Sequence, residues 1–225
     1  MPVTSLRRPL DYQGPDKPLV RGWIHTVMAP VMLLAGLAML IWAPTAGLRA
    51  AVAVYALSAI ILFGCSALYH RFYWGPEATA LLRRLDHSNI FLFIAGTYTP
   101  LAVALTSGTS RVLLLSIVWG VAAAGILFRI FWLSAPRWLY TLLYIAMGWT
   151  ALGWMVQFWR NGGPGVVVML VLGGVVYTLG AVVYARKRPD PSPRWFGYHE
   201  IFHAATAIAA VCHYLAISLA LGAHL

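Results

Sequence analysis

Residues 166–185 read VVVMLVLGGVVYTLGAVVYA, an apolar run without a single charged side chain. A helix needs roughly 20 mostly apolar residues to cross the hydrocarbon core of a bilayer. A transmembrane β-strand would instead show about ten residues of alternating polarity, and this run does not alternate. The stretch therefore predicts a membrane-spanning α-helix.

Similar apolar runs occur on both sides of this one, separated by glycine, proline and charged residues. They predict an all-α integral membrane protein, a seven-transmembrane helix bundle. Its expected spans lie at about 23–42, 50–70, 86–106, 112–132, 138–158, 166–185 and 199–221. Residues 1–22 contain no apolar run, which predicts a polar tail without a cleavable signal peptide. Residues 23–225 are then one transmembrane domain.

The composition agrees with a membrane location and indicates an orientation. The chain is 61% hydrophobic and 10% charged, whereas an ordinary soluble domain has about 25% charged residues. With the N-terminus in the cytoplasm, 13 of the 16 lysines and arginines fall on the cytoplasmic side, as the positive-inside rule requires. Seven spans then place the C-terminus outside. The net charge of +10 is thus explained by topology, and no nucleic-acid partner is expected.

Several polar side chains are expected at membrane depth in the cytoplasmic leaflet. His70 ends the second predicted span, Asp86 opens the third, and His199 and His203 open the seventh. Polar groups at this depth are costly and are therefore functional candidates. At a helix N-terminus, Asp86 would also be favoured in its ionised form.

The spacing of these residues predicts a metal site. His199 and His203 are four residues apart and share one helical face, as do Ser66 and His70. Three imidazoles leave one position of a tetrahedral Zn²⁺ open, which is typical of a catalytic zinc site. Other divalent metals remain compatible with the sequence.

The string His199-Glu200-Ile201-Phe202-His203 also matches the H-E-x-x-H pattern of zinc proteases, in which Glu is the general base. A protease is disfavoured, because the string lies at the mouth of a membrane helix and its third ligand would come from much earlier in the chain. Glu200 can instead face Arg194 or lipid headgroups.

Four segments together resemble the hemolysin III family, the bacterial branch of the progestin and adipoQ receptor group, which includes the adiponectin receptors and is related to alkaline ceramidases. These segments are Ser66-x-x-x-His70, Leu85-Asp86-His87-Ser88-Asn89-Ile90, Ala95-Gly96-Thr97-Tyr98-Thr99-Pro100 and His199-Glu200-Ile201-Phe202-His203 with His213-Tyr214. The resemblance implies a seven-helix protein of the bacterial inner membrane with zinc near the cytoplasmic face. His70, His199 and His203 would be its ligands. Asp86 would hold the metal-bound water, and Ser66 would support the site or stabilise an oxyanion.

Two classes of function follow. The first is a metal-dependent hydrolase of membrane lipids, for which the ceramidase relationship implies a fatty-acid amide or ester. The second is a non-enzymatic sensor or regulator, or the cytolysin of the family name, with structural zinc. Of the other histidines, we expect His25 at the interface beside Trp23, with a place along the access route to the site as the alternative. We expect His87 as an interfacial or supporting residue, and His213 hydrogen-bonded inside the bundle too far along the helix to share the metal.

Overall fold

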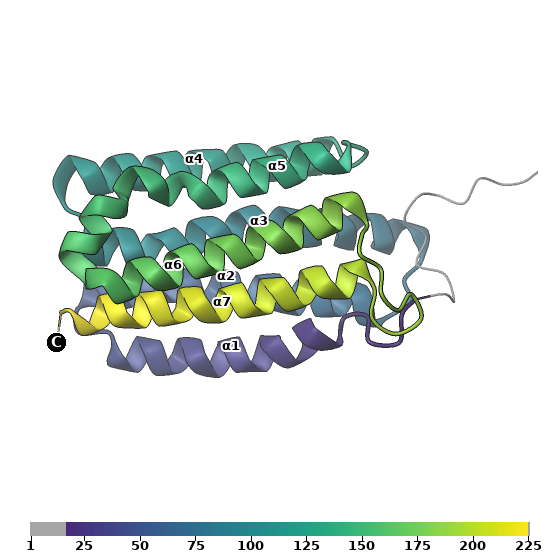
Figure 1. Ribbon diagram of the computed structural model, residues 1–225, viewed down its shortest axis with the longest axis horizontal. Coiled ribbons are helices and arrows are strands. Elements are labelled where there is room, and N and C mark those ends of the chain that lie inside the picture. Colours follow the sequence, from purple (N-terminus) through teal and green to yellow (C-terminus); the bar gives the residue numbers. More distant parts are fainter. Residues whose placement is uncertain (1–16, 225) are drawn as a thin grey trace, which may run out of the picture.

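The computed structural model describes residues 17–224, and every regular element in this part of the chain is helical (Figure 1). The helices lie side by side with roughly parallel axes. They are α1 (Trp23–Trp42), α2 (Ala46–Arg71), α3 (Pro76–Leu105), α4 (Gly108–Phe131), α5 (Arg137–Gly148), the 3₁₀-helix η1 (Trp149–Trp154), α6 (Met155–Arg186) and α7 (Tyr198–Gly222). Most of the predicted polar tail, residues 1–16, lies outside the described residues.

Six helical stretches of the described chain are long and apolar enough to cross a membrane. The bounds of α1 coincide with the predicted span, and α7 differs from its prediction by one residue at each end. The start of α3 was predicted wrongly, because that helix begins at Pro76, ten residues before Asp86. Asp86 therefore lies about three turns inside α3, and the expected stabilisation of its charge by a helix N-terminus does not apply.

The fifth of these stretches, Arg137–Arg186, is 50 residues long and turns back on itself. Gly163 has φ 80° and ψ 175°, a conformation that interrupts the helix and that other residues rarely adopt. The side chain of Trp149 donates a hydrogen bond to Thr178 Oγ1 over 3.0 Å. In one straight helix, residues 29 positions apart would lie roughly 44 Å from each other. The chain therefore reverses direction at Gly163, as Figure 1 shows for α5 and α6.

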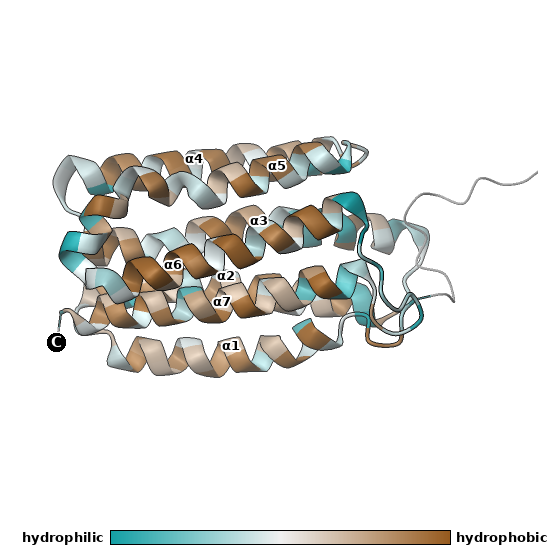
Figure 2. Ribbon diagram, in the orientation of Figure 1, coloured by the Kyte–Doolittle hydropathy of each residue, from teal (hydrophilic) through white to brown (hydrophobic). Residues whose placement is uncertain are grey.

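The outside of the bundle is apolar. Leu34, Ile41, Phe131 and Val156 are each more than 60% exposed, and apolar residues recur along every helix (Figure 2). Hydrophilic residues gather near the helix ends, most clearly where α6 ends and α7 begins. A soluble protein rarely exposes apolar surface on this scale, so the surface fits an integral membrane helical bundle.

Candidate metal centre

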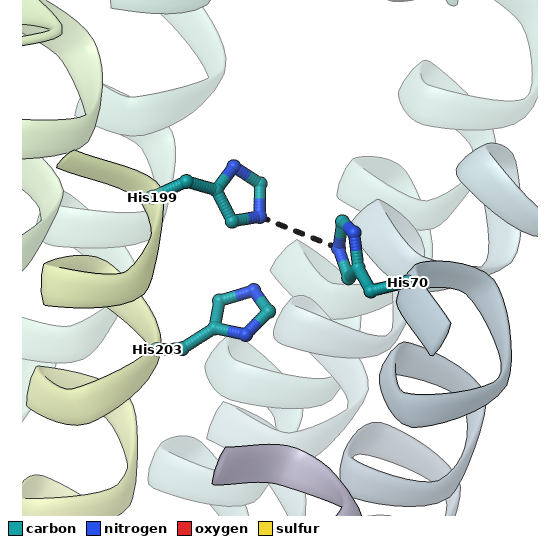
Figure 3. Close-up of side chains that lie close together, drawn as sticks. All are labelled: His70, His199 and His203. Atoms are coloured by element: carbon teal, nitrogen blue, oxygen red, sulfur yellow. Dashed lines mark hydrogen bonds between the residues drawn. The ribbon is translucent and has the colours of Figure 1, made fainter. Parts of the chain in front are cut away.

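Three histidines from two helices meet at one end of the bundle. His70 lies in the last turn of α2, and His199 and His203 lie in the first two turns of α7. One ring nitrogen from each lies within 4.8 Å of those of the other two. Nε2 of His199 is 3.3 Å from Nε2 of His70 (Figure 3). The structure thus brings together the three residues that the sequence indicated as ligands.

The chemistry of this cluster fits a divalent metal ion. Two imidazole nitrogens that face each other can share only one proton, whereas a cation between them is bound by both lone pairs. Nδ1 of His70 is buried and has no hydrogen-bond partner among the described residues. His70 and His203 are nearly inaccessible to solvent, and imidazole is the commonest side-chain ligand of metal ions in proteins. Zn²⁺ suits such nitrogen donors, and other divalent metals fit them too.

Asp86 and Ser66 stand beside the histidines, as predicted. Oδ2 of Asp86 is 3.5 Å from Nε2 of His70, although Asp86 comes from α3 and His70 from α2. The Ser66 hydroxyl hydrogen-bonds the Asp86 carboxylate. Both side chains line a small cavity together with His199 and His203. A carboxylate and a hydroxyl therefore face the same space as two of the imidazoles.

This polar cavity adjoins a larger apolar one. The larger cavity lies between α3, α5, η1, α6 and α7. It shares six lining residues with the polar cavity: Leu62, Ile90, Tyr144, Ala181, Phe202 and Thr206. The arrangement places a long apolar space next to the histidine cluster.

Glu200 lies between the two histidines of α7 in sequence, but its carboxylate is occupied elsewhere. One oxygen accepts a hydrogen bond from Arg21 Nε, and the other accepts one from the Gly197 backbone N–H over 2.9 Å. Glu200 is 1% exposed. The expected partner, Arg194, is thus replaced by Arg21, and Glu200 caps α7 and joins it to the segment before α1.

A second cation from the segment before α1 contacts the end of α2. Lys17 Nζ donates hydrogen bonds to the backbone oxygens of His70, over 3.1 Å, and Phe72, over 2.9 Å. Partial burial, reinforced by the nearby Arg21 and Arg71, lowers the pKa of Lys17 to about 8. Lys17 and Arg21 together hold the chain preceding α1 against the helices that carry the histidines.

The structure places His25 inside the bundle and not at the interface. Its side chain is 3% exposed and lines the polar cavity, nearer to the alternative of a place along the access route. Its ring stacks on that of His203, with ring centroids 3.9 Å apart and planes inclined by 5°. A usable signal was present, since His25 follows the three-to-four-residue spacing of Met28, Met32 and Met39, which form the buried face of α1.

His87 lines the same polar cavity as its neighbour Asp86. Nε2 of His87 lies 3.4 Å from the Tyr184 hydroxyl, and Nδ1 lies 3.2 Å from Nη2 of Arg129. Arg129, in the last turn of α4, is fully buried, with its guanidinium 4.3 Å from the centre of the Tyr140 ring. A buried cation therefore lies directly behind one wall of the cavity.

The two remaining histidines lie away from the cluster. His213 lines the apolar cavity and hydrogen-bonds the backbone of Leu170, which agrees with an internal structural role. His224 contacts the Ala104 carbonyl oxygen over 2.8 Å, beyond the end of α7. Within the described residues, the group able to hold a metal comprises His70, His199 and His203.

Comparisons with known proteins identify the family of the chain. The family model described as "Haemolysin-III related" matches residues 14–214, most of the chain. Hemolysin-3 of Bacillus cereus is 36% identical over 62% of this chain and 64% of its own length, so the match spans less than two thirds of that relative. A Hemolysin-3 homolog of Bacillus subtilis is 33% identical over 67% of this chain and 68% of its own. The adiponectin receptor protein of Drosophila melanogaster is 27% identical over 72% of this chain and 40% of its own. The chain therefore belongs to the haemolysin-III related family.

Proposed function

We propose that this protein is a zinc-dependent hydrolase that cleaves amide or ester bonds of lipids within the membrane. The observation that carries the proposal is the convergence of His70, His199 and His203 beside Asp86 and Ser66, in a cavity that adjoins a large apolar one. Nitrogen ligands, a nearby carboxylate and space for an acyl chain are the parts that such a reaction needs.

We propose that the chain crosses the bacterial inner membrane seven times, with its N-terminus in the cytoplasm. The reversal at Gly163 supports two crossings within Arg137–Arg186. A straight helix of 50 residues would be roughly 75 Å long, more than twice the thickness of the hydrocarbon core. The excess of arginine and lysine at the His70 end of the bundle supports that end as the cytoplasmic one.

His70, His199 and His203 would hold the ion. A zinc ion held by them would supply a Lewis acid and an acidic water at neutral pH. Asp86, next to His70, lines the cavity and is placed to take up a proton there as a general base. Ser66 holds the carboxylate by a hydrogen bond and so fixes its direction. The hydroxyl can alternatively donate to the substrate oxygen on which negative charge develops.

The apolar cavity supports a lipid as substrate. Its walls include Phe93, Leu101, Met155 and Leu170, which suit a hydrocarbon chain. The six residues that line both cavities lie between this space and the histidines, so a chain held there would present its polar end to the cluster. An acyl amide or ester has this combination of a long apolar chain and one polar carbonyl.

A non-enzymatic sensor or regulator, or a cytolysin, is the second candidate. The observation that favours it is that His70 comes from α2 and the other two histidines from α7, helices that otherwise touch little. A metal ion held by both would tie them together and stabilise one arrangement of the bundle. In that case the ion is structural, and Asp86 serves to orient His70.

One experiment separates the two candidates. Purified protein is analysed for bound metal and then incubated with a panel of ceramides and acyl esters, with fatty acid release as the readout. Stoichiometric zinc and a release that disappears in Asp86→Asn support the hydrolase. Stoichiometric zinc with no release from any lipid favours the sensor or regulator.

A further inference from the structure

His25 is a buried polar residue with no assigned task. It lies in the first turn of α1, is 3% exposed, and lines the polar cavity with Ser66 and Asp86. Neither of its ring nitrogens makes a hydrogen bond of good geometry to a described residue, although the His203 backbone lies near one of them. An unsatisfied buried nitrogen is destabilising, and phenylalanine could fill a similar space without that cost. A bound molecule with a polar group in the cavity would account for a histidine at this position.

The geometry excludes His25 as a further ligand of the ion that His203 would hold. A metal bound to an imidazole lies in the plane of that ring, about 2 Å from the nitrogen. The His25 and His203 planes are almost parallel, with ring centroids 3.9 Å apart. An ion in the plane of His203 therefore lies outside the plane of His25, and the His25 lone pair cannot point at it.

The same stacking holds His25 firmly in place. One face of its ring lies on His203, and Phe63 meets it edge to face at a centroid distance of 5.0 Å. The ring nitrogens are thus fixed beside the metal ligands, next to the position where a substrate carbonyl would approach. Fixed donors of this kind bind a substrate oxygen without losing conformational freedom.

We propose that His25 is a substrate-binding residue whose ring N–H donates a hydrogen bond to an oxygen of the acyl group. The oxygen belongs to the carbonyl of the lipid amide or ester, or to the carboxylate of the fatty acid that hydrolysis releases. This assignment rests on the proposed function for the chemistry of its ligand. In this assignment His25 binds the lipid, whereas His70, His199 and His203 bind the metal.

The test uses the full-length protein in detergent and two readouts besides activity: the visible spectrum of the Co²⁺-substituted protein and the equilibrium binding of oleate to the zinc-loaded protein. His25→Phe keeps the stacking on His203 but removes both nitrogens. We expect a wild-type Co²⁺ spectrum and an oleate Kd raised about ten- to a hundredfold, the size of a lost hydrogen bond to a charged group. His224→Phe is the matched control and should bind oleate as wild type does.

His25→Gln retains a donor without the ring and keeps the test decisive if His25→Phe does not fold. It should bind oleate more tightly than His25→Ala. Oleate affinity of His25→Phe within twofold of wild type would overturn the assignment, as would equal losses in His25→Gln and His25→Ala. An altered Co²⁺ spectrum in His25→Phe would also overturn it, because the nitrogens would then act on the metal site. Failure of the wild-type protein to bind oleate would overturn it as well.

These measurements distinguish the His25 assignment from the proposed hydrolysis. His25-dependent oleate binding without fatty acid release from any lipid would leave the assignment standing and reject the hydrolase. Fatty acid release with an unchanged KM and an unchanged oleate affinity in His25→Phe would support the hydrolase and reject the His25 assignment.

Discussion

At the scale of single residues, the three clustered imidazoles have the most direct consequence. Replacing His70, His199 or His203 by Ala removes one of three nitrogens that lie within 4.8 Å of one another. Each variant should lose tight zinc binding. Each should also lose the stabilisation that bound metal provides, about 2.7 kcal/mol when free zinc is a hundredfold above its Kd. Metal analysis and thermal unfolding with and without a chelator measure the two effects.

His213→Ala and His224→Ala are the controls for this prediction, because both residues lie outside the cluster. They should retain zinc in full, and a chelator should lower their melting temperatures as much as that of the wild type. Full zinc occupancy in His70→Ala would contradict a site shared by α2 and α7.

The two carboxylates near the cluster should behave differently. Asp86 faces the cavity, 3.5 Å from His70, so Asp86→Asn should keep most of the zinc and lower kcat about 10²- to 10⁴-fold, the range for loss of a general base. Glu200 is held by Arg21 and Gly197, so Glu200→Gln should chiefly lower the free energy of unfolding, by up to about 5 kcal/mol. Activity per bound zinc should be preserved. Zinc content, fatty acid release and thermal unfolding are compared for both variants in the same detergent.

An active Asp86→Asn beside an inactive, zinc-loaded Glu200→Gln would reverse these roles and favour the H-E-x-x-H mechanism. The hydrogen bond between Glu200 and the Gly197 N–H is a reason to expect otherwise, since it uses one carboxylate oxygen for capping α7.

Much of the site could be predicted from sequence, because a helical spacing of four fixes which side chains share a face. That rule paired His199 with His203 and Ser66 with His70. It could not show that His25 would stack on His203, because that contact depends on how α1 packs against α7. Nor could it show that His87 and Asp86 would line one cavity, because adjacent residues on a helix point about 100° apart and a broad cavity can still include both.

At the scale of elements, Gly163 carries the reversal within Arg137–Arg186. Its φ of 80° and ψ of 175° lie in a region that is essentially restricted to glycine. Gly163→Ala should therefore destabilise the protein by about 1–3 kcal/mol through backbone strain, measured by thermal unfolding of the purified protein.

Gly120→Ala is the matched control, because Gly120 lies within α4 and an added Cβ there meets no atom within 4 Å. This substitution should be neutral or slightly stabilising, since alanine favours helix more than glycine does. If Gly163→Ala were equally well tolerated, the reversal would not depend on the glycine conformation.

The start of α3 could not be predicted from apolar periodicity alone. Apolar periodicity marks where a helix enters the hydrocarbon, but a helix can continue into water when its residues and cap allow it. Pro76 at the first helical position and Glu77 in the first turn suit a helix start. Arg83 and Arg84 lie beyond that start, and their charges made the segment look like a loop.

At the scale of the whole molecule, the bundle keeps its polar groups inside and near one end, while the outside is apolar. The apolar runs made this architecture predictable, since each run must bury its backbone polar groups in a helix. The cavities were not predictable, because they are the spaces left between helices that are distant in sequence. Phe202 and Leu62, for example, line both cavities from α7 and α2.

The last prediction concerns the number and direction of the crossings. If Arg137–Arg186 crosses twice, with its turn at Gly163, a reporter inserted at residues 161–165 should lie outside the cytoplasm. One inserted at 186–198 should then be cytoplasmic, and one fused after Leu225 should again be outside, because α7 adds one more crossing. The arginines and lysines around 186–194 favour the cytoplasm for the second position. Alkaline phosphatase and green fluorescent protein fusions, active on opposite sides of the inner membrane, measure all three positions. Reporters at 186–198 and after Leu225 on the same side would contradict the seven-crossing topology and, with it, the placement of the histidine cluster in the cytoplasmic leaflet.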